Sequence, residues 1–248
     1  MSAGVILLLA VTIAATSFLS GIFGMAGGML LMGVLVAFFS VPAAMVVHAI
    51  TQMAANGWRA VLWRAHVDGR IVLRYLAGLL AATAIFAAID YVPSRAVVLI
   101  SIGIAPFIGL TVPLAYAPRI DRAGGAELAG FIGGALQLLS GVSGPALDMF
   151  FVRTAIDRRG VVATKASCQV LTHLAKLIYF GGLASDGWEE IDLPLLPGAV
   201  LLAIAGTTLA RGALERMSNA QFRRWTRWIV LALGGFYLVL GLRALAAG

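Results

Sequence analysis

Charged residues are scarce in this chain and are absent from long stretches of it. Only 12% of its 248 residues are Asp, Glu, Lys or Arg, and none of these occurs before Arg59. Soluble domains carry about 25% charged residues. Disorder is excluded as well, because disordered chains combine dense charge with low hydrophobicity, whereas 61% of this chain is hydrophobic. The composition therefore predicts an integral membrane protein.

Motifs of several function classes are also missing. The single cysteine, Cys168, excludes an internal disulfide. The chain has no CxxC or HExxH spacing for a metal and no nucleotide-binding loop. We therefore expect no cofactor, no metal, no enzymatic activity and no ATP-driven pumping. The net charge of +7 would suit nucleic-acid binding in a soluble protein. In a membrane protein, arginines in cytoplasmic loops explain it, so no nucleic-acid partner is expected.

Apolar windows of membrane-spanning length follow one another along the chain. After Arg74, five windows of 15 to 23 residues carry no charge. A helix needs about 20 residues to cross the hydrocarbon. The predicted crossings are 43–63, 71–89, 96–116, 161–183, 194–212 and 225–245.

Two further apolar stretches contain interruptions. Residues 4–40 would make a straight helix of about 55 Å, too long for one crossing, and they are interrupted at Gly24–Gly28. Residues 126–152 are interrupted at Gly141–Pro145. We expect 4–40 to belong to the membrane domain rather than to a cleaved signal, because no basic segment precedes it.

The two interrupted stretches resemble each other, which predicts a duplication. Leu19–Ala26 aligns with Leu139–Ala146 at an offset of 120 residues. Downstream, Gln52 matches Gln169 and Arg59 matches Lys176 at an offset of 117. The alternative is chance similarity between Gly- and Leu-rich helices. The predicted halves are 1–120 and 121–248, each with one broken segment and three crossings.

Loop charges predict the orientation. Arginines gather in loops 64–74, 117–123, 153–160 and 211–227, whereas loop 184–192 is acidic. The positive-inside rule places the basic loops in the cytoplasm, here of a bacterial-type inner membrane. Segment 126–152 must then enter and return on one side, and by the repeat 4–40 does so from the other. We therefore predict an all-α polytopic membrane protein of two inverted-topology repeats, a plan typical of secondary transporters.

The interruptions are candidate substrate-binding elements. Broken backbone inside a bilayer is buried or lines a wet cavity, and the N-terminus of each half-helix attracts anions. The alternative is that these small residues only allow tight helix packing. The candidate residues at the breaks are Ser20, Gly21, Gly24, Gly27, Ser140, Gly141, Ser143 and Gly144.

Polar residues at matched positions extend the candidate site. Gln52 and Gln169 fall near mid-helix, and Asn56 and His173 lie one turn further on. A polar stripe at this depth faces either a cavity or a partner helix. An interhelical hydrogen bond therefore remains the alternative to substrate binding.

Five residues are candidates for charge attraction or coupling. Arg59 and Lys176 either attract anions at opposite mouths or snorkel to the interface. His48 and Lys165 either complete an anion site or simply snorkel to the interface. Asp148 is either a protonation site or an ion-pair partner of Arg153. His173 is also a candidate proton carrier.

The two Gly-rich elements, Ser20–Gly28 and Ser140–Pro145, resemble those of the TauE/SafE (TSUP) family of sulfite exporters and sulfonate or sulfoacetate transporters. The resemblance implies a secondary transporter of small organosulfur anions, coupled to protons or to the membrane potential. It also implies that the substrate sits between the two elements. An anion channel on the same scaffold and a non-transporting assembly factor remain alternatives. The expected partners are a small anion and membrane lipid, and a homodimer stays open.

Overall fold

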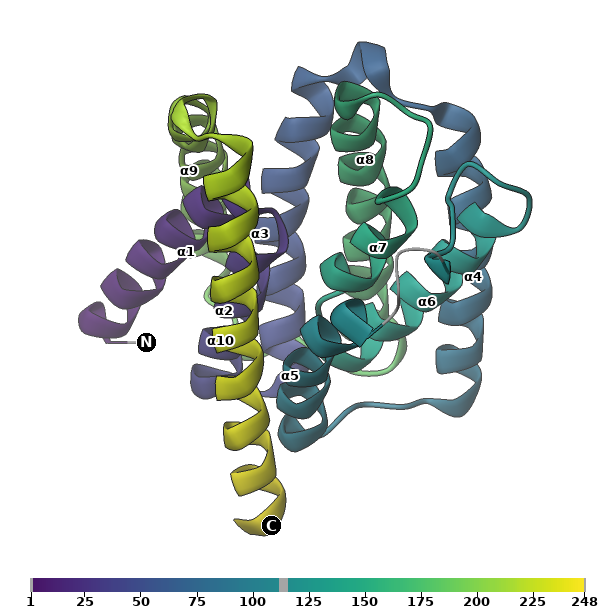
Figure 1. Ribbon diagram of the computed structural model, residues 1–248. Helices are drawn as coiled ribbons and strands as arrows, with labels where there is room; N and C mark the ends of the chain where they lie inside the picture. The colour runs from purple at the N-terminus through teal and green to yellow at the C-terminus, as the bar shows by residue number, and fades with distance from the viewer. Residues whose placement is uncertain (1, 112–115, 248) are drawn as a thin grey trace.

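The computed structural model describes residues 2–111 and 116–247, and every regular element in them is helical. Figure 1 shows α3 and α8 side by side, with α1, α2, α9 and α10 on one side of them and α4, α6 and α7 on the other. The helices are α1 (Ala3–Phe23), α2 (Met25–Phe38), α3 (Val41–Leu62), α4 (Gly69–Ile89), α5 (Arg95–Thr111), α6 (Gly125–Ser140), α7 (Gly144–Phe151), α8 (Arg158–Ile178), α9 (Leu196–Arg216) and α10 (Asn219–Ala247).

The all-helical class predicted from the sequence is confirmed, and four candidate membrane spans support the membrane class. Among the described residues, four helical segments are long and apolar enough to cross a membrane: Ala3–Phe23, Gly69–Ile89, Leu193–Ala213 and Arg224–Ala246. Three predicted crossings, 43–63, 96–116 and 161–183, are helical in their described parts but are not among these four. The polar residues of α3 and α8 lower their hydropathy. The apolar part of α5, Arg95–Ile108, is shorter than the other spans. The predicted crossing 96–116 extends into 112–115, which lies outside the described residues, as do the end residues Met1 and Gly248 of the predicted halves.

Both predicted interruptions are present. α1 ends and α2 begins at Gly24, whose φ of 68° is positive. α6 ends at Gly141, with φ of 75°, and α7 begins three residues later at Gly144. A positive φ is disfavoured for residues with a Cβ, which explains why glycine stands at each break.

The segment formed by α6 and α7 returns to its starting side. The backbone N–H of Ile120, before α6, donates to the carbonyl of Phe150 near the end of α7, at 3.0 Å. The N–H of Ala155 donates to the carboxylate of Asp121 at 3.2 Å. Loops 117–123 and 153–160 therefore lie together, as the sequence predicted.

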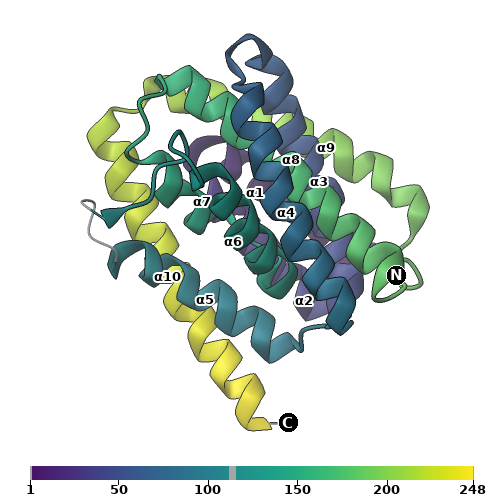
Figure 2. The same cartoon turned by 90° about the vertical axis from the view of Figure 1, so that its right-hand side faces the viewer.

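α3 and α8 run antiparallel. At one end of the pair, the N–H of Ser40 donates to Glu190, which follows α8, at 2.9 Å. At the other end, the N–H of Asp68, which follows α3, donates to Thr164 near the start of α8, at 2.9 Å. The other close helix pairs are α1 with α9, α4 with α6 and α5 with α10, and Figure 2 shows α10 crossing α5.

Glycines allow two of these helix pairs to approach closely. A Cβ on Gly78 of α4 would overlap the carbonyl of Glu127 in α6. A Cβ on Gly206 of α9 would lie 2.6 Å from the carbonyl of Ala14 in α1. Close backbone packing of this kind is characteristic of helix association in membranes.

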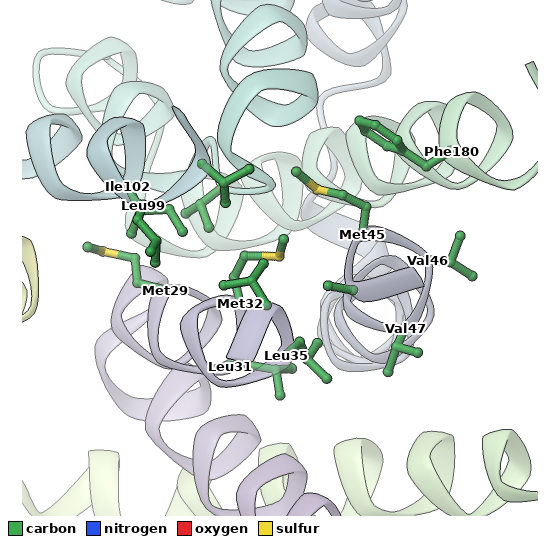
Figure 3. Packing of buried hydrophobic residues seen from close by; sticks show 14 of the residues in the cluster. Met29, Leu31, Met32, Leu35, Met45, Val46, Val47, Leu99, Ile102 and Phe180 are labelled. Carbon is green, nitrogen blue, oxygen red and sulfur yellow. The ribbon is translucent and has the colours of Figure 1, made fainter. Parts of the chain in front are cut away.

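The main apolar core surrounds α2. Met29 and Met32 of α2 face Leu99 and Ile102 of α5, with Met45 of α3 beside them (Figure 3). Large apolar side chains also point outward, and more than half of the surface of each is exposed. They include Leu7, Val11, Leu73, Leu80, Leu201, Leu209, Phe236 and Leu242. An apolar exterior above a packed interior is the arrangement that lipid requires.

Candidate functional site

A small cavity lies where the two helix breaks meet α3 and α8. Its volume is about 20 Å³, enough for roughly one water molecule. It is therefore a narrow site in this conformation. Its lining residues are Gly24, Met25, Gly28, His48, Gln52, Asn56, Val142, Ser143, Gly144, Gln169 and His173.

Two helix N-termini converge on this cavity. α2 starts at Gly24 and Met25, and α7 starts at Ser143 and Gly144. The two starts touch, since a Cβ on Gly144 would lie 2.8 Å from the Cβ of Met25. Neither start has a side-chain cap. The first N–H groups of a helix have no partner within it, so both ends present hydrogen-bond donors and positive dipole ends.

Gln52 adds a further donor. Its side chain is 5% exposed, and its amide nitrogen is buried without a hydrogen-bond partner. The matched Gln169 places its amide nitrogen 3.8 Å from the Cβ position of Gly144. Buried polar atoms normally have partners, so an unpaired donor beside a cavity suits a ligand that accepts hydrogen bonds. The interhelical hydrogen bond considered from the sequence is not made by this nitrogen.

Two histidines, His48 and His173, also line the cavity, with ring centroids 5.5 Å apart. The Nε2 of His48 lies 2.9 Å from the carbonyl of Gly28. A carbonyl can only accept, so Nε2 carries the proton and Nδ1 of the neutral ring accepts from Lys176, at 2.7 Å. The Nδ1 of His173 accepts from Gln137, at 2.9 Å. These tautomers are assigned from the partners.

The matched cations Arg59 and Lys176 each bind a carbonyl at the end of a broken helix. Arg59 donates to the carbonyl of Ser20, near the end of α1, at 3.0 Å. Lys176 donates to the carbonyl of Gly141, at the end of α6, at 3.1 Å. The last carbonyls of a helix have no partner within it and attract cations. Lys176 is fully buried, so the snorkelling alternative is wrong for this residue.

Lys165 and Asp148 form an ion pair beside the cavity. Their side chains are 16% and 35% exposed. The ammonium of Lys165 lies 3.8 Å from the Cβ position of Gly24, at the start of α2. Asp148 is also close enough to Arg59 for their opposite charges to attract. The sequence had offered Arg153 as the ion-pair partner of Asp148, whereas the fold brings Lys165 to it.

One protein-family model, described as sulfite exporter TauE/SafE, matches residues 8–237. The chain belongs to the TauE/SafE family. TauE/SafE is a family of membrane transporters and not a family of enzymes. The protein is therefore a multi-pass integral membrane protein of a transporter family. No curated protein and no solved structure matches the chain.

The structure brings many of the predicted site residues of this TauE/SafE protein to the cavity. The predicted residues that line it are Gly24, His48, Gln52, Asn56, Ser143, Gly144, Gln169 and His173. Asn56 also accepts a hydrogen bond from Arg59, at 3.2 Å. Arg59 therefore reaches the cavity wall through Asn56.

Five predicted residues lie beside the breaks but do not line the cavity: Ser20, Gly21, Gly27, Ser140 and Gly141. Gly21 packs on Ala210 of α9, and Gly27 packs on Thr16. The hydroxyl of Ser140 donates to backbone carbonyls of its own segment. Gly141 faces two methionines of the core. The contacts of Gly21 and Gly27 are those of close helix packing, whereas the hydroxyl of Ser20 is buried without a hydrogen-bond partner.

Sequence reasoning missed Met25, Gly28 and Val142, which line the cavity, and Gln137, which holds His173. Gly28 belongs to the Gly-rich element, but the sequence alone did not indicate which of its glycines face inward. Gln137 lies one turn before the second break, and its position on an apolar helix was an available signal.

Proposed function

We propose that this protein is a secondary transporter that binds a small anion between the N-termini of α2 and α7. The single observation that carries the proposal is the pair of uncapped helix starts that meet at one cavity beside the unpaired amide of Gln52. Backbone N–H groups at helix starts are common ligands for sulfate-like and carboxylate anions. Family membership favours sulfite, and the resemblance of the Gly-rich elements extends the candidates to a sulfonate or sulfoacetate.

The charges around the cavity support an anionic substrate. Arg59 and Lys165 are positively charged, and Asp148 is the one carboxylate described in contact with them. The formal charge near the site is therefore positive. Positive surroundings of this kind raise the local concentration of anions.

We also propose that the halves 1–120 and 121–248 form an inverted repeat. The equivalence of α1–α5 with α6–α10 relates the α1–α9 pair to the α6–α4 pair. It relates the pairs α3–α8 and α5–α10 to themselves, as a two-fold axis between the halves requires. The antiparallel α3 and α8, and the matched roles of Arg59 and Lys176, fit an axis that lies in the membrane plane.

The proposed mechanism is alternating access, because the cavity is too small for a sulfonate without widening. His48 and Lys176 lie towards the end of α3 and α8 that carries the acidic loop, and both are at most 1% exposed. Lys165 and Asp148 lie towards the opposite, basic end and are partly exposed. We propose that the basic end faces the cytoplasm of an inner membrane and that the described conformation is sealed on the other side. The coupling ion would be the proton, for which His173 beside the cavity is a candidate.

Flux measured in proteoliposomes tests this proposal. Sulfite, taurine and sulfoacetate should each compete for saturable counterflow, whereas unitary currents would instead indicate a channel. Gln52→Ala should raise the half-saturating concentration about tenfold to a hundredfold, since hydrogen bonds to charged groups contribute about 1.5–3 kcal/mol.

The matched control is Gln221→Ala, which removes an exposed glutamine at the start of α10. Its flux should equal that of the unaltered protein. The absence of flux for every small anion in well-folded protein would refute the proposed function.

A further inference from the structure

The ion pair between Asp148 and Lys165 lies beside the proposed anion site. Lys165 reaches the start of α2, where its ammonium lies 3.8 Å from the Cβ position of Gly24. An anion bound to the first N–H groups of α2 would therefore touch this ammonium. In the described conformation the ammonium is bound to the carboxylate of Asp148.

Asp148 belongs to the second break element. It lies four residues after Gly144, on the short helix α7 whose start forms the other side of the cavity. The carboxylate of Asp148 is therefore carried by α7 and binds Lys165, the cation beside the start of α2. A transported anion and Asp148 would need the same partner.

The exposure of the pair makes such an exchange feasible. Asp148 is 35% exposed and Lys165 16% exposed, and partly solvated ion pairs are weak because water competes for both groups. Lys176 differs, since it is fully buried and donates to both His48 and Gly141. Breaking its contacts would leave buried polar atoms unpaired, which is costly. Lys165 is therefore the exchangeable cation of the site.

We propose that Asp148 is a built-in competitor of the substrate: its carboxylate occupies Lys165 while the site is empty, and the transported anion displaces it. This inference rests on the proposed anion site. Displacement leaves Lys165 and Arg59 facing the anion and releases the Asp148 carboxylate towards the partly exposed basic end. The strength of the Asp148–Lys165 pair then sets how tightly the site holds its anion.

The test measures sulfite affinity by isothermal titration of the purified full-length protein. Asp148→Asn removes the competitor and should lower the Kd about tenfold, which corresponds to about 1.4 kcal/mol. Lys165→Gln removes the shared cation and should raise the Kd by at least about tenfold. The double variant should match Lys165→Gln, because no ammonium remains to compete for, and this non-additivity is the signature of competition. Glu127→Gln, which breaks the Arg74–Glu127 surface ion pair, is the matched control and should leave the Kd unchanged.

Two results would overturn the inference while the proposed function stands. If Asp148→Asn weakens binding as Lys165→Gln does, the carboxylate only positions the lysine. If Asp148→Asn leaves the Kd unchanged, the pair takes no part in binding. Failure of the proposed function is a different result, namely no binding and no flux of sulfite, taurine or sulfoacetate in any variant, and it would remove this inference too.

A spectroscopic measurement keeps the proposal falsifiable if Asp148→Asn does not fold. Infrared difference spectra of the protein with ¹³C-labelled aspartate carboxylates should show a shifted carboxylate band when sulfite is added. The shift should be absent in Lys165→Gln. An unshifted band in the unaltered protein, at saturating sulfite, would contradict displacement.

Discussion

Replacing Gly141 with alanine tests whether the second break is a tightly packed, conformationally demanding element. Its φ is 75°, and a Cβ there would lie 2.8 Å from the sulfur of Met32 and 2.9 Å from that of Met45. A left-handed conformation costs a residue with a Cβ about 1–2 kcal/mol. Forcing extra volume into a packed core costs about 1–3 kcal/mol. We therefore expect Gly141→Ala to lose about 2–5 kcal/mol of stability.

Gly124→Ala is the matched control. Its φ of 74° is nearly the same, and nothing lies within 4 Å of the added Cβ. It should lose only the backbone part, about 1–2 kcal/mol. At about 2–4 °C per kcal/mol for a chain of this size, Gly141→Ala should melt roughly 2–12 °C below Gly124→Ala.

The assay is thermal unfolding of detergent-purified protein, followed by tryptophan fluorescence, with sulfite flux measured in parallel. The carbonyl of Gly141 accepts from both Lys176 and Gln137, so moving it disturbs both flanks of the cavity. Flux should fall in Gly141→Ala and persist in Gly124→Ala. Equal melting temperatures for the two variants would refute this reasoning, because they would mean that Met32 and Met45 can move away from the added methyl group without any loss of stability.

Two further predictions concern stability. Arg119 and the N–H of Ala155 stabilise the ionised carboxylate of Asp121 and lower its pKa to about 2. A carboxyl group with a lowered pKa stabilises the folded state above its unfolded pKa, and this contribution is lost as the pH falls through about 2. Asp121→Asn should therefore melt at a lower temperature than the unaltered protein at neutral pH, and the two melting temperatures should converge in strong acid. Tyr75 and Thr172 share a buried hydrogen bond of 2.8 Å. Tyr75→Phe should lower the stability by about 1 kcal/mol, whereas Thr172→Val should lower it more because the buried tyrosine hydroxyl is left without a partner. Equal melting temperatures for the two variants would contradict this expectation.

The breaks and the polar stripe were predictable because they rest on local chemistry. Glycine at a positive φ and polar residues one turn apart at mid-helix depth both leave a signal in the sequence. That signal identified Gly24, Gln52 and Gln169, all of which line the cavity. The predicted ranges 43–63 and 71–89 lie within two residues of α3 and α4, whereas α10 begins six residues before the predicted 225.

The partners of the charged residues could not be predicted in the same way. Arg59 and Lys176 bind backbone carbonyls, and a carbonyl looks the same at every position of a sequence. Which face of a Gly-rich element turns inward depends on the dihedral angles of the break, so Gly21 and Gly27 could not be separated from Gly24. The pairing of Asp148 with Lys165 depends on how α7 returns beside α8, a long-range contact that residue spacing does not encode.

The antiparallel pair of α3 and α8 has a consequence for how the protein is made. Neither helix belongs to the four segments apolar enough to cross a membrane on their own merits, yet their polar residues are buried where the two meet the breaks. Exposing the polar residues of either helix to lipid is unfavourable until the other helix packs against it. More than ninety residues separate the end of α3 from the start of α8, so α3 is synthesised well before its partner. Biogenesis is therefore expected to hold α3 in a sheltered place at the insertion machinery, and the amino-terminal half should not persist alone in the bilayer.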